Sequence, residues 1–108
     1  VTSDLHAVAG AELLVAATPA VALPGLAREF AGRGTRVPLI WLSKGFVAAP
    51  GLPAGVGLAH QVVEPQWPSP VGIVSGPTFA EEVARGMPAA LTVAATRPEL
   101  AASVAALT

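Results

Sequence analysis

The stretch Val71-Gly72-Ile73-Val74-Ser75-Gly76-Pro77-Thr78-Phe79-Ala80-Glu81-Glu82 decides the fold of this chain. It begins with an apolar run that is typical of a buried strand, and a tight turn at Gly76 follows. Thr78 and Glu81 have the spacing of a capping box, and Gly86 is in position to end the helix. Open α/β sheets bind their ligands beyond the carboxyl ends of such strands. We therefore expect a strand, a turn and a helix that border a binding site.

The rest of the chain repeats this order of strand and helix. We expect strands over residues 13–18, 37–42, 71–74 and 90–95, and helices up to residue 9 and over 20–30, 57–64, 79–85 and 98–107. Residues 46–56 are rich in proline and glycine and are expected to form a loop. Alternation of strands and helices implies a parallel sheet with right-handed crossovers. The sequence thus predicts one α/β domain with about four mostly parallel strands and flanking helices.

Composition narrows the classes of protein to which the chain can belong. It has 108 residues, of which 53% are hydrophobic and only 12% are charged, against about 25% charged in ordinary soluble domains. The net charge of −1 predicts neither a nucleic-acid nor a membrane-surface partner. The chain has no cysteine, no basic-then-apolar leader and no uninterrupted apolar run of membrane-spanning length. We expect a cytoplasmic location and packing against further protein.

Lys44 is the candidate binding residue that stands out, because it is the only lysine and follows an expected strand. The carboxyl ends of parallel strands meet at one edge of a sheet, which brings Pro19, Lys44 and residues 76–80 to the same side. An ammonium group there can bind a phosphate or a polarised oxygen. A solvated loop lysine is an equally good interpretation of the residue by itself.

The turn after the third expected strand also has two interpretations. Gly76 allows close approach of a ligand, Thr78 adds a hydroxyl, and the helix start favours an anion. The capping box would form without any ligand, and spacing alone favours that view. His6 and His60 lie away from the expected edge, which favours surface or packing roles. The chain holds no complete catalytic constellation and no metal-ligand cluster.

Two motifs together resemble the bacterial NAD(P)-dependent glycerol-3-phosphate dehydrogenases. They are Lys44-Gly45-Phe46 and the run from Ser75 to Ala80, Ser-Gly-Pro-Thr-Phe-Ala. Residues 4–5, 11–15 and 19, and then 81–90, resemble the same family in the same order, so the likeness covers nearly the whole chain. Either motif alone would be a weak signal, and the pair is specific.

The resemblance implies reduction of dihydroxyacetone phosphate to glycerol 3-phosphate with NAD(P)H as cofactor. It implies substrate contacts at Lys44, Gly76 and Thr78, cofactor contacts at Lys44, Ala80 and Pro19, no catalytic residue within this fragment, and no metal. It also implies that residues 1–108 are the latter part of a Rossmann domain. The family's Gly-rich phosphate loop would precede this part, and its helical domain with the proton-transferring lysine would follow.

Two other functions stay open beside this one: a related dehydrogenase acting on another small acid, and a non-catalytic module that binds a ligand or partner.

We expect the isolated chain to be inactive, because the phosphate loop and the catalytic lysine lie outside it. In the usual strand order of a Rossmann sheet, the strand at 13–18 pairs with a strand that precedes this chain. Its open edge predicts self-association of the isolated chain.

Overall fold

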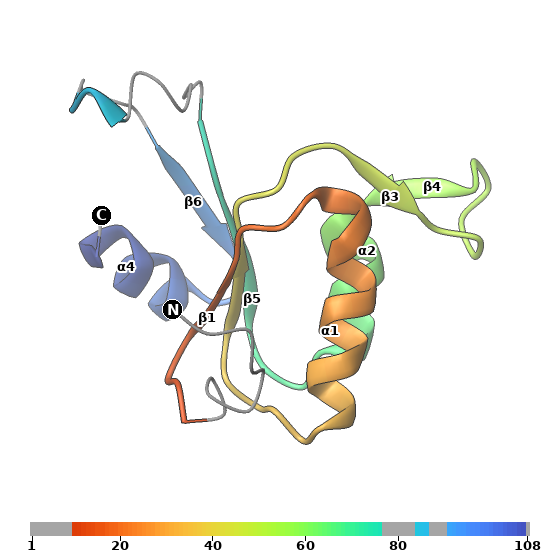
Figure 1. The fold of residues 1–108 in the computed structure, drawn as a ribbon, viewed down its shortest axis with the longest axis horizontal. Coiled ribbons are helices and arrows are strands. Elements are labelled where there is room, and N and C mark those ends of the chain that lie inside the picture. The colour runs from red at the N-terminus through yellow and green to blue at the C-terminus, as the bar shows by residue number, and fades with distance from the viewer. Residues whose placement is uncertain (1–9, 77–83, 87–90, 108) are drawn as a thin grey trace.

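A four-stranded sheet forms the centre of the computed structural model, which describes residues 10–76, 84–86 and 91–107 (Figure 1). Its strands lie in the order β1-β2-β5-β6. They comprise β1 (Leu14–Ala16), β2 (Leu39–Trp41), β5 (Val71–Ser75) and β6 (Thr92–Ala95). The first three run parallel, with Leu14 opposite Leu39 and Leu39 opposite Val71. The predicted class, an α/β fold with mostly parallel strands, is confirmed.

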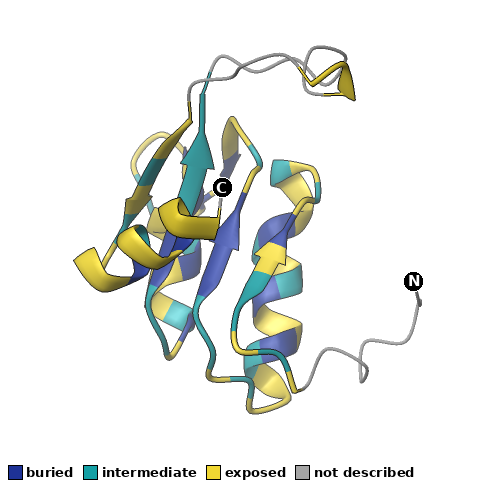
Figure 2. Cartoon of the chain, turned by 90° about the vertical axis from the view of Figure 1, so that its left-hand side faces the viewer, coloured by how far each residue is buried: buried dark blue, intermediate teal, exposed yellow. Residues whose placement is uncertain are grey.

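One face of the sheet is covered by the helices that follow β1 and precede β5. These are η2 (Ala20–Ala22), α1 (Leu23–Gly32), α2 (Ala59–Val63) and η3 (Glu64–Gln66). Leu23 of α1 and Val63 of α2 have no exposed surface, and they belong to the same core cluster as Trp41. Pro24 stands in the first turn of α1, where its missing N–H costs no helix bond. Figure 2 shows the buried residues of these elements on the sides that meet the sheet.

The opposite face is covered by α4 (Pro98–Leu107), whose predicted bounds are confirmed. Leu100 and Val104 lie one helical turn apart on its inner side. Both are buried against Ile40 of β2. Figure 1 shows α4 and the α1–α2 pair on opposite sides of the sheet. The apolar runs predicted as strands are therefore enclosed from both faces at β2, as continuous apolar sequence requires.

The sheet departs from an all-parallel arrangement at β6, which runs antiparallel to β5. The amide of Thr96 donates to the carbonyl of Val71 at 2.9 Å, and the Thr96 hydroxyl accepts from the Val71 amide at 3.1 Å. These bonds hold the end of β6 beside the start of β5. An apolar run is compatible with either strand direction. The alternation of strands and helices predicts a parallel strand here, but the tertiary contacts with β5 make β6 antiparallel.

The loop predicted over residues 46–56 is confirmed for residues 49–55 and wrong at its ends, residues 46–48 and 56, which are strand. Two short antiparallel strands, β3 (Phe46–Ala48) and β4 (Val56–Leu58), form a hairpin there. The prolines and glycines of this segment lie in the connection between the strands, and Gly55 takes a φ of 74°. The helix predicted over 57–64 begins only at Ala59, because residues 57 and 58 belong to β4.

Several other predictions lie outside the described residues: the helix up to residue 9, the capping box, and most of the helix over 79–85. The strands over 13–18, 37–42 and 71–74 are present with bounds that differ by no more than two residues at either end. Within the part of the chain that the structure describes, no helix is long and apolar enough to span a bilayer.

Candidate functional site

Three loops leave the sheet on the same side, at the carboxyl ends of β1, β2 and β5, because these strands run parallel. In the site described below, the edge of the sheet is this row of strand ends. The loop after β1 carries Pro19, the loop after β2 carries Ser43 and Lys44, and the loop after β5 begins with Gly76. Residues that are far apart in sequence are thus neighbours here, as the expected alternation of strands predicted.

Lys44 spans the gap between two of these loops. Its Nζ atom donates a hydrogen bond to the backbone carbonyl of Gly76, with 2.6 Å between donor and acceptor. An ammonium group has three donors, so two remain for another acceptor. The side chain is exposed, and it forms no salt bridge with any carboxylate of the described residues. Lys44 is therefore a positive charge that is held in place and still able to bind an anion or a polarised oxygen.

Ser43 makes the corresponding link in the other direction. Its hydroxyl donates to the backbone carbonyl of Thr18, at the end of β1. The amide of Leu42 also donates to the carbonyl of Ala16 at 3.0 Å, which continues the pairing of β1 and β2 to this point. The chain then turns at Gly45, whose φ of 112° is unfavourable for other residues. Three consecutive residues, Ser43 to Gly45, thus shape the loop.

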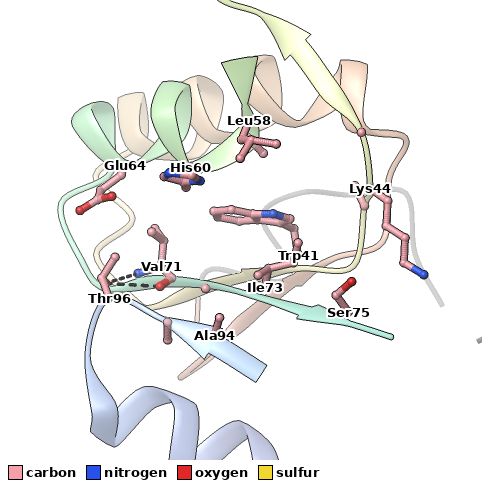
Figure 3. Close-up of a pocket in the computed structure, with 15 residues that line it drawn as sticks. Trp41, Lys44, Leu58, His60, Glu64, Val71, Ile73, Ser75, Ala94 and Thr96 are labelled. Carbon is pink, nitrogen blue, oxygen red and sulfur yellow. Dashed lines mark hydrogen bonds between the residues drawn. The ribbon is translucent and has the colours of Figure 1, made fainter. Parts of the chain in front are cut away.

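A cavity of about 430 Å³ opens between α2 and the neighbouring face of the sheet (Figure 3). Trp41 of β2 and Val71 and Ile73 of β5 contribute apolar surface to it. Ser43, Lys44 and Gly45 of the β2 loop also line the cavity, so it is continuous with the edge of the sheet. An apolar cavity with a few polar groups in its lining is the usual form of a small-molecule site.

Polar side chains lie at the two ends of the cavity. In Figure 3, Lys44 and Ser75 lie at the end that meets the edge of the sheet, and His60 of α2 and Glu64 of η3 lie at the other. Glu64 directly follows α2 and lies four positions after His60, which places the two side chains on one side of the helical segment. The cation and the carboxylate are separated by the apolar middle of the cavity, so a bound molecule would meet opposite charges at its two ends.

The predicted site residues fall into two groups. Lys44 and Gly76 contact each other, and Pro19 is exposed at the start of η2, directly after Thr18. Thr78 and Ala80 lie outside the described residues.

Sequence reasoning missed Ser43 and Ser75, and placed His60 away from the site although it lines the cavity. The adjacency of Ser43 to Lys44 at a strand end was a usable signal. The position of His60 depends on where α2 packs, which no local pattern reveals.

The described residues include no group of three potential metal ligands. A salt bridge of 3.0 Å joins Glu29 of α1 to Arg33, the residue directly after that helix. Both partners of that pair are partly exposed, and the pair lies outside the cavity lining. Lys44 therefore provides the cationic chemistry of the described site.

Known protein families and sequences match the chain over most of its length. The chain matches the family model for the N-terminus of NAD-dependent glycerol-3-phosphate dehydrogenase over residues 1–101. It is 42% identical over 103 residues to the glycerol-3-phosphate dehydrogenase (NAD(P)+) of Nitrosospira multiformis, covering 94% of this chain and 29% of that relative. The enzyme of the same name from Dechloromonas aromatica is 43% identical over 108 residues, covering 97% of this chain and 31% of the relative. The chain thus spans under a third of the length of these relatives.

Solved structures show the same fold. The glycerol-3-phosphate dehydrogenase of Coxiella burnetii matches with a TM-score of 0.79 at 22% identity, over 95% of this chain and 31% of that one. The DsGPDH of Dunaliella salina matches with a TM-score of 0.77 at 26% identity, over 91% of this chain and 17% of that one. These neighbours extend well beyond the region that the present chain covers.

Proposed function

We propose, for a chain that belongs to the NAD-dependent glycerol-3-phosphate dehydrogenase family, that it forms part of an enzyme interconverting dihydroxyacetone phosphate and glycerol 3-phosphate with NAD(P)H. The observation that carries the proposal is the contact of Lys44 with Gly76, which joins the two motifs of the sequence at one edge of the sheet. The names of the 42% and 43% identical relatives support the same reaction.

Lys44 is the residue that we assign to the substrate. Its two remaining donors bind an oxygen of the phosphorylated substrate, while the Gly76 carbonyl keeps the ammonium group at the edge of the cavity. Gly76 lets the backbone approach the substrate closely, because it has no side chain. We assign a further substrate contact to Thr78, and cofactor contacts to Lys44, Ala80 and Pro19. The apolar residues of the cavity lower the local dielectric constant on one side of these charged contacts, which strengthens them.

The residues at this edge fit a nicotinamide cofactor. The Thr18 hydroxyl oxygen, at the end of β1, is buried and has no hydrogen-bond partner among the described residues. A buried hydroxyl without a partner is costly, and a bound polar group would satisfy it. When bound, the cofactor supplies the hydride that reduces the substrate carbonyl. Lys44 holds the substrate at the edge of the sheet, within the cavity that it shares with Trp41 and Ile73.

We also propose that residues 1–108 are the latter part of a NAD(P)-binding Rossmann domain, and that the Gly-rich loop and a helical substrate domain belong to other parts of the protein. The under-one-third coverage of the relatives supports this. Large exposed apolar residues support it too: Val15 on β1 is 56% exposed, and Phe46 on the hairpin is 70% exposed. Such surface is usually covered by further protein.

Two finer proposals follow for the molecule as a whole. The isolated chain self-associates through the 13–18 edge, because β1 pairs on one side only among the described strands. The complete enzyme acts in the cytoplasm, since a phosphorylated triose and NAD(P)H are charged molecules that do not cross a bilayer unaided.

The proposed reaction is tested by assaying the complete protein, with NADH and NADPH, against dihydroxyacetone phosphate and a panel of small 2-oxo acids. We expect the complete protein to turn over dihydroxyacetone phosphate and residues 1–108 alone to show no turnover.

Replacement Lys44→Met should lower kcat/KM about a hundredfold or more, since a lost charged donor at a reacting group costs this much. Arg28→Met on the exposed surface of α1 is the control and should leave kcat/KM unchanged. Preference for a 2-oxo acid, or near-normal kinetics of Lys44→Met, would contradict the assignment.

A further inference from the structure

We infer that Ser43 is a positioning residue for Lys44, an inference that rests on the proposed function. Ser43 and Lys44 are consecutive, yet their side chains bind carbonyls on opposite sides of β2. The Ser43 hydroxyl donates to Thr18 at the end of β1, and the Lys44 ammonium donates to Gly76 at the end of β5. The loop after β2 is therefore tied to both of its neighbours.

The place of β2 in the sheet explains this geometry. β2 lies between β1 and β5, so the loop that follows it has the loops after β1 and β5 on its two sides. The Leu42 amide is still paired with the Ala16 carbonyl at 3.0 Å, so the strand-like path continues up to Ser43. Beyond Lys44 the chain turns at Gly45, with its φ of 112°. Ser43 is the last point at which the loop is attached to β1 before the lysine.

The attachment matters because the Lys44 side chain is long and exposed. Binding a ligand through Lys44 costs conformational entropy of the lysine side chain and of the loop that carries it. Anchoring the loop in advance reduces the loop's share of that cost. The Gly76 carbonyl holds the far end of the side chain, and Ser43 holds the near end. Without the Ser43 bond the lysine keeps its charge and its partner, but the backbone from which its side chain extends can shift. Substrate affinity should fall although no substrate contact is removed.

Ser69 offers a matched control at the opposite end of the sheet. Its hydroxyl also donates to a backbone carbonyl of another loop, that of Arg36, before the starts of β5 and β2. Ser43→Ala and Ser69→Ala therefore remove the same kind of bond, one beside Lys44 and one far from it. A purely structural role for such bonds predicts similar effects of both changes on folding and none on the ligand.

The experiment uses the complete enzyme. Binding of glycerol 3-phosphate is measured by isothermal titration calorimetry in the presence of NADH, with which it cannot react, and melting temperatures are recorded in parallel. We expect Ser43→Ala to raise Kd about tenfold, Ser43→Thr to stay within about threefold of the unmutated enzyme because it retains the hydroxyl, and Ser69→Ala to stay within about twofold.

A double-mutant cycle on kcat/KM then tests whether Ser43 acts through Lys44. Ser43→Ala should lower kcat/KM about tenfold in the unmutated enzyme and by less than about twofold when Lys44→Met is already present. Equal losses in both backgrounds, or equal Kd changes for Ser43→Ala and Ser69→Ala, would overturn the inference and leave the proposed function standing. If the unmutated enzyme did not bind glycerol 3-phosphate, the proposed function would itself be overturned, and the inference with it.

Discussion

Gly72, the second residue of β5, lies where the sheet leaves no room for a side chain. A Cβ atom added there would lie 2.7 Å from the carbonyl oxygen of Ala94 and 2.8 Å from the Cδ1 atom of Ile40. The first of these neighbours is backbone of the adjacent strand and cannot move aside as a flexible side chain can. The glycine is therefore required by the close approach of β6 and not by its own backbone angles.

We predict that Gly72→Ala lowers the free energy of unfolding by about 1–3 kcal/mol, the usual cost of overpacking a core. The matched control is Gly25→Ala in α1, where an added Cβ meets nothing within 4 Å. That change should raise the free energy of unfolding by about 0.5–1 kcal/mol, because alanine is the better helix former. Urea unfolding measures both, and equal effects of the two variants would show that the contact at β6 is not limiting.

At the site, the sequence predicts the positions of Lys44 and Gly76 but not the bond between them. Lys44 and Gly76 were predicted to share an edge, and they share a hydrogen bond. The sequence favours a binding role for Lys44 no more than the role of a solvated loop lysine. The partner of Lys44 is a backbone carbonyl 32 positions away. Backbone carbonyls carry no sequence signature, so the bond could not be predicted.

At the scale of elements, the β3–β4 hairpin is where the structure departs furthest from expectation. Each strand has one buried residue between two exposed ones, Val47 in β3 and Gly57 in β4. These two residues are direct partners across the hairpin. Three-residue strands are too short for an alternating pattern to stand out from the surrounding prolines and glycines. The hairpin forms because its inner side packs on the main core, to which Val47 belongs.

We predict that this packing holds the hairpin in place. Val47 is 3% exposed, and Val47→Ala should lower the free energy of unfolding by about 2 kcal/mol, since the site loses two buried methyl groups and leaves a cavity. Val56→Thr is the control, because Val56 is 49% exposed on the outer side and threonine keeps its branched shape. It should change the free energy of unfolding by less than about 0.5 kcal/mol. A small effect of Val47→Ala would mean that the hairpin contributes little to the fold.

At the scale of the whole molecule, the sheet of the described residues has two open edges. β1 pairs only with β2, and β6 pairs only with β5. An edge strand presents unpaired N–H and C=O groups that can bind another strand. Val15 adds exposed apolar surface to the β1 edge, and few charges in the chain oppose association.

We predict that residues 1–108 in isolation sediment as a dimer or larger species whose share rises with concentration. Val15→Lys should restore the monomer, because a charged side chain on an edge strand blocks pairing. Val21→Lys is the matched control, since Val21 is 81% exposed and lies in η2, away from the edge strand. Association that persists in Val15→Lys, or a monomer at every concentration of the unmutated chain, would contradict the assignment of the edge.

The sequence by itself determined the order of the four strands of the main sheet and of α1, α2 and α4 along the chain, the enclosed apolar strand β2, and the meeting of Lys44 with Gly76 at one edge. These follow from local chemistry, since apolar runs, prolines and glycines act over a few residues. Only the tertiary structure decided the direction of β6, the hairpin and the carbonyl partners of Ser43 and Lys44. Those features depend on backbone groups and packing surfaces that distant segments bring together. Backbone N–H and C=O groups are the same in every sequence, and no local pattern shows which distant surfaces will pack.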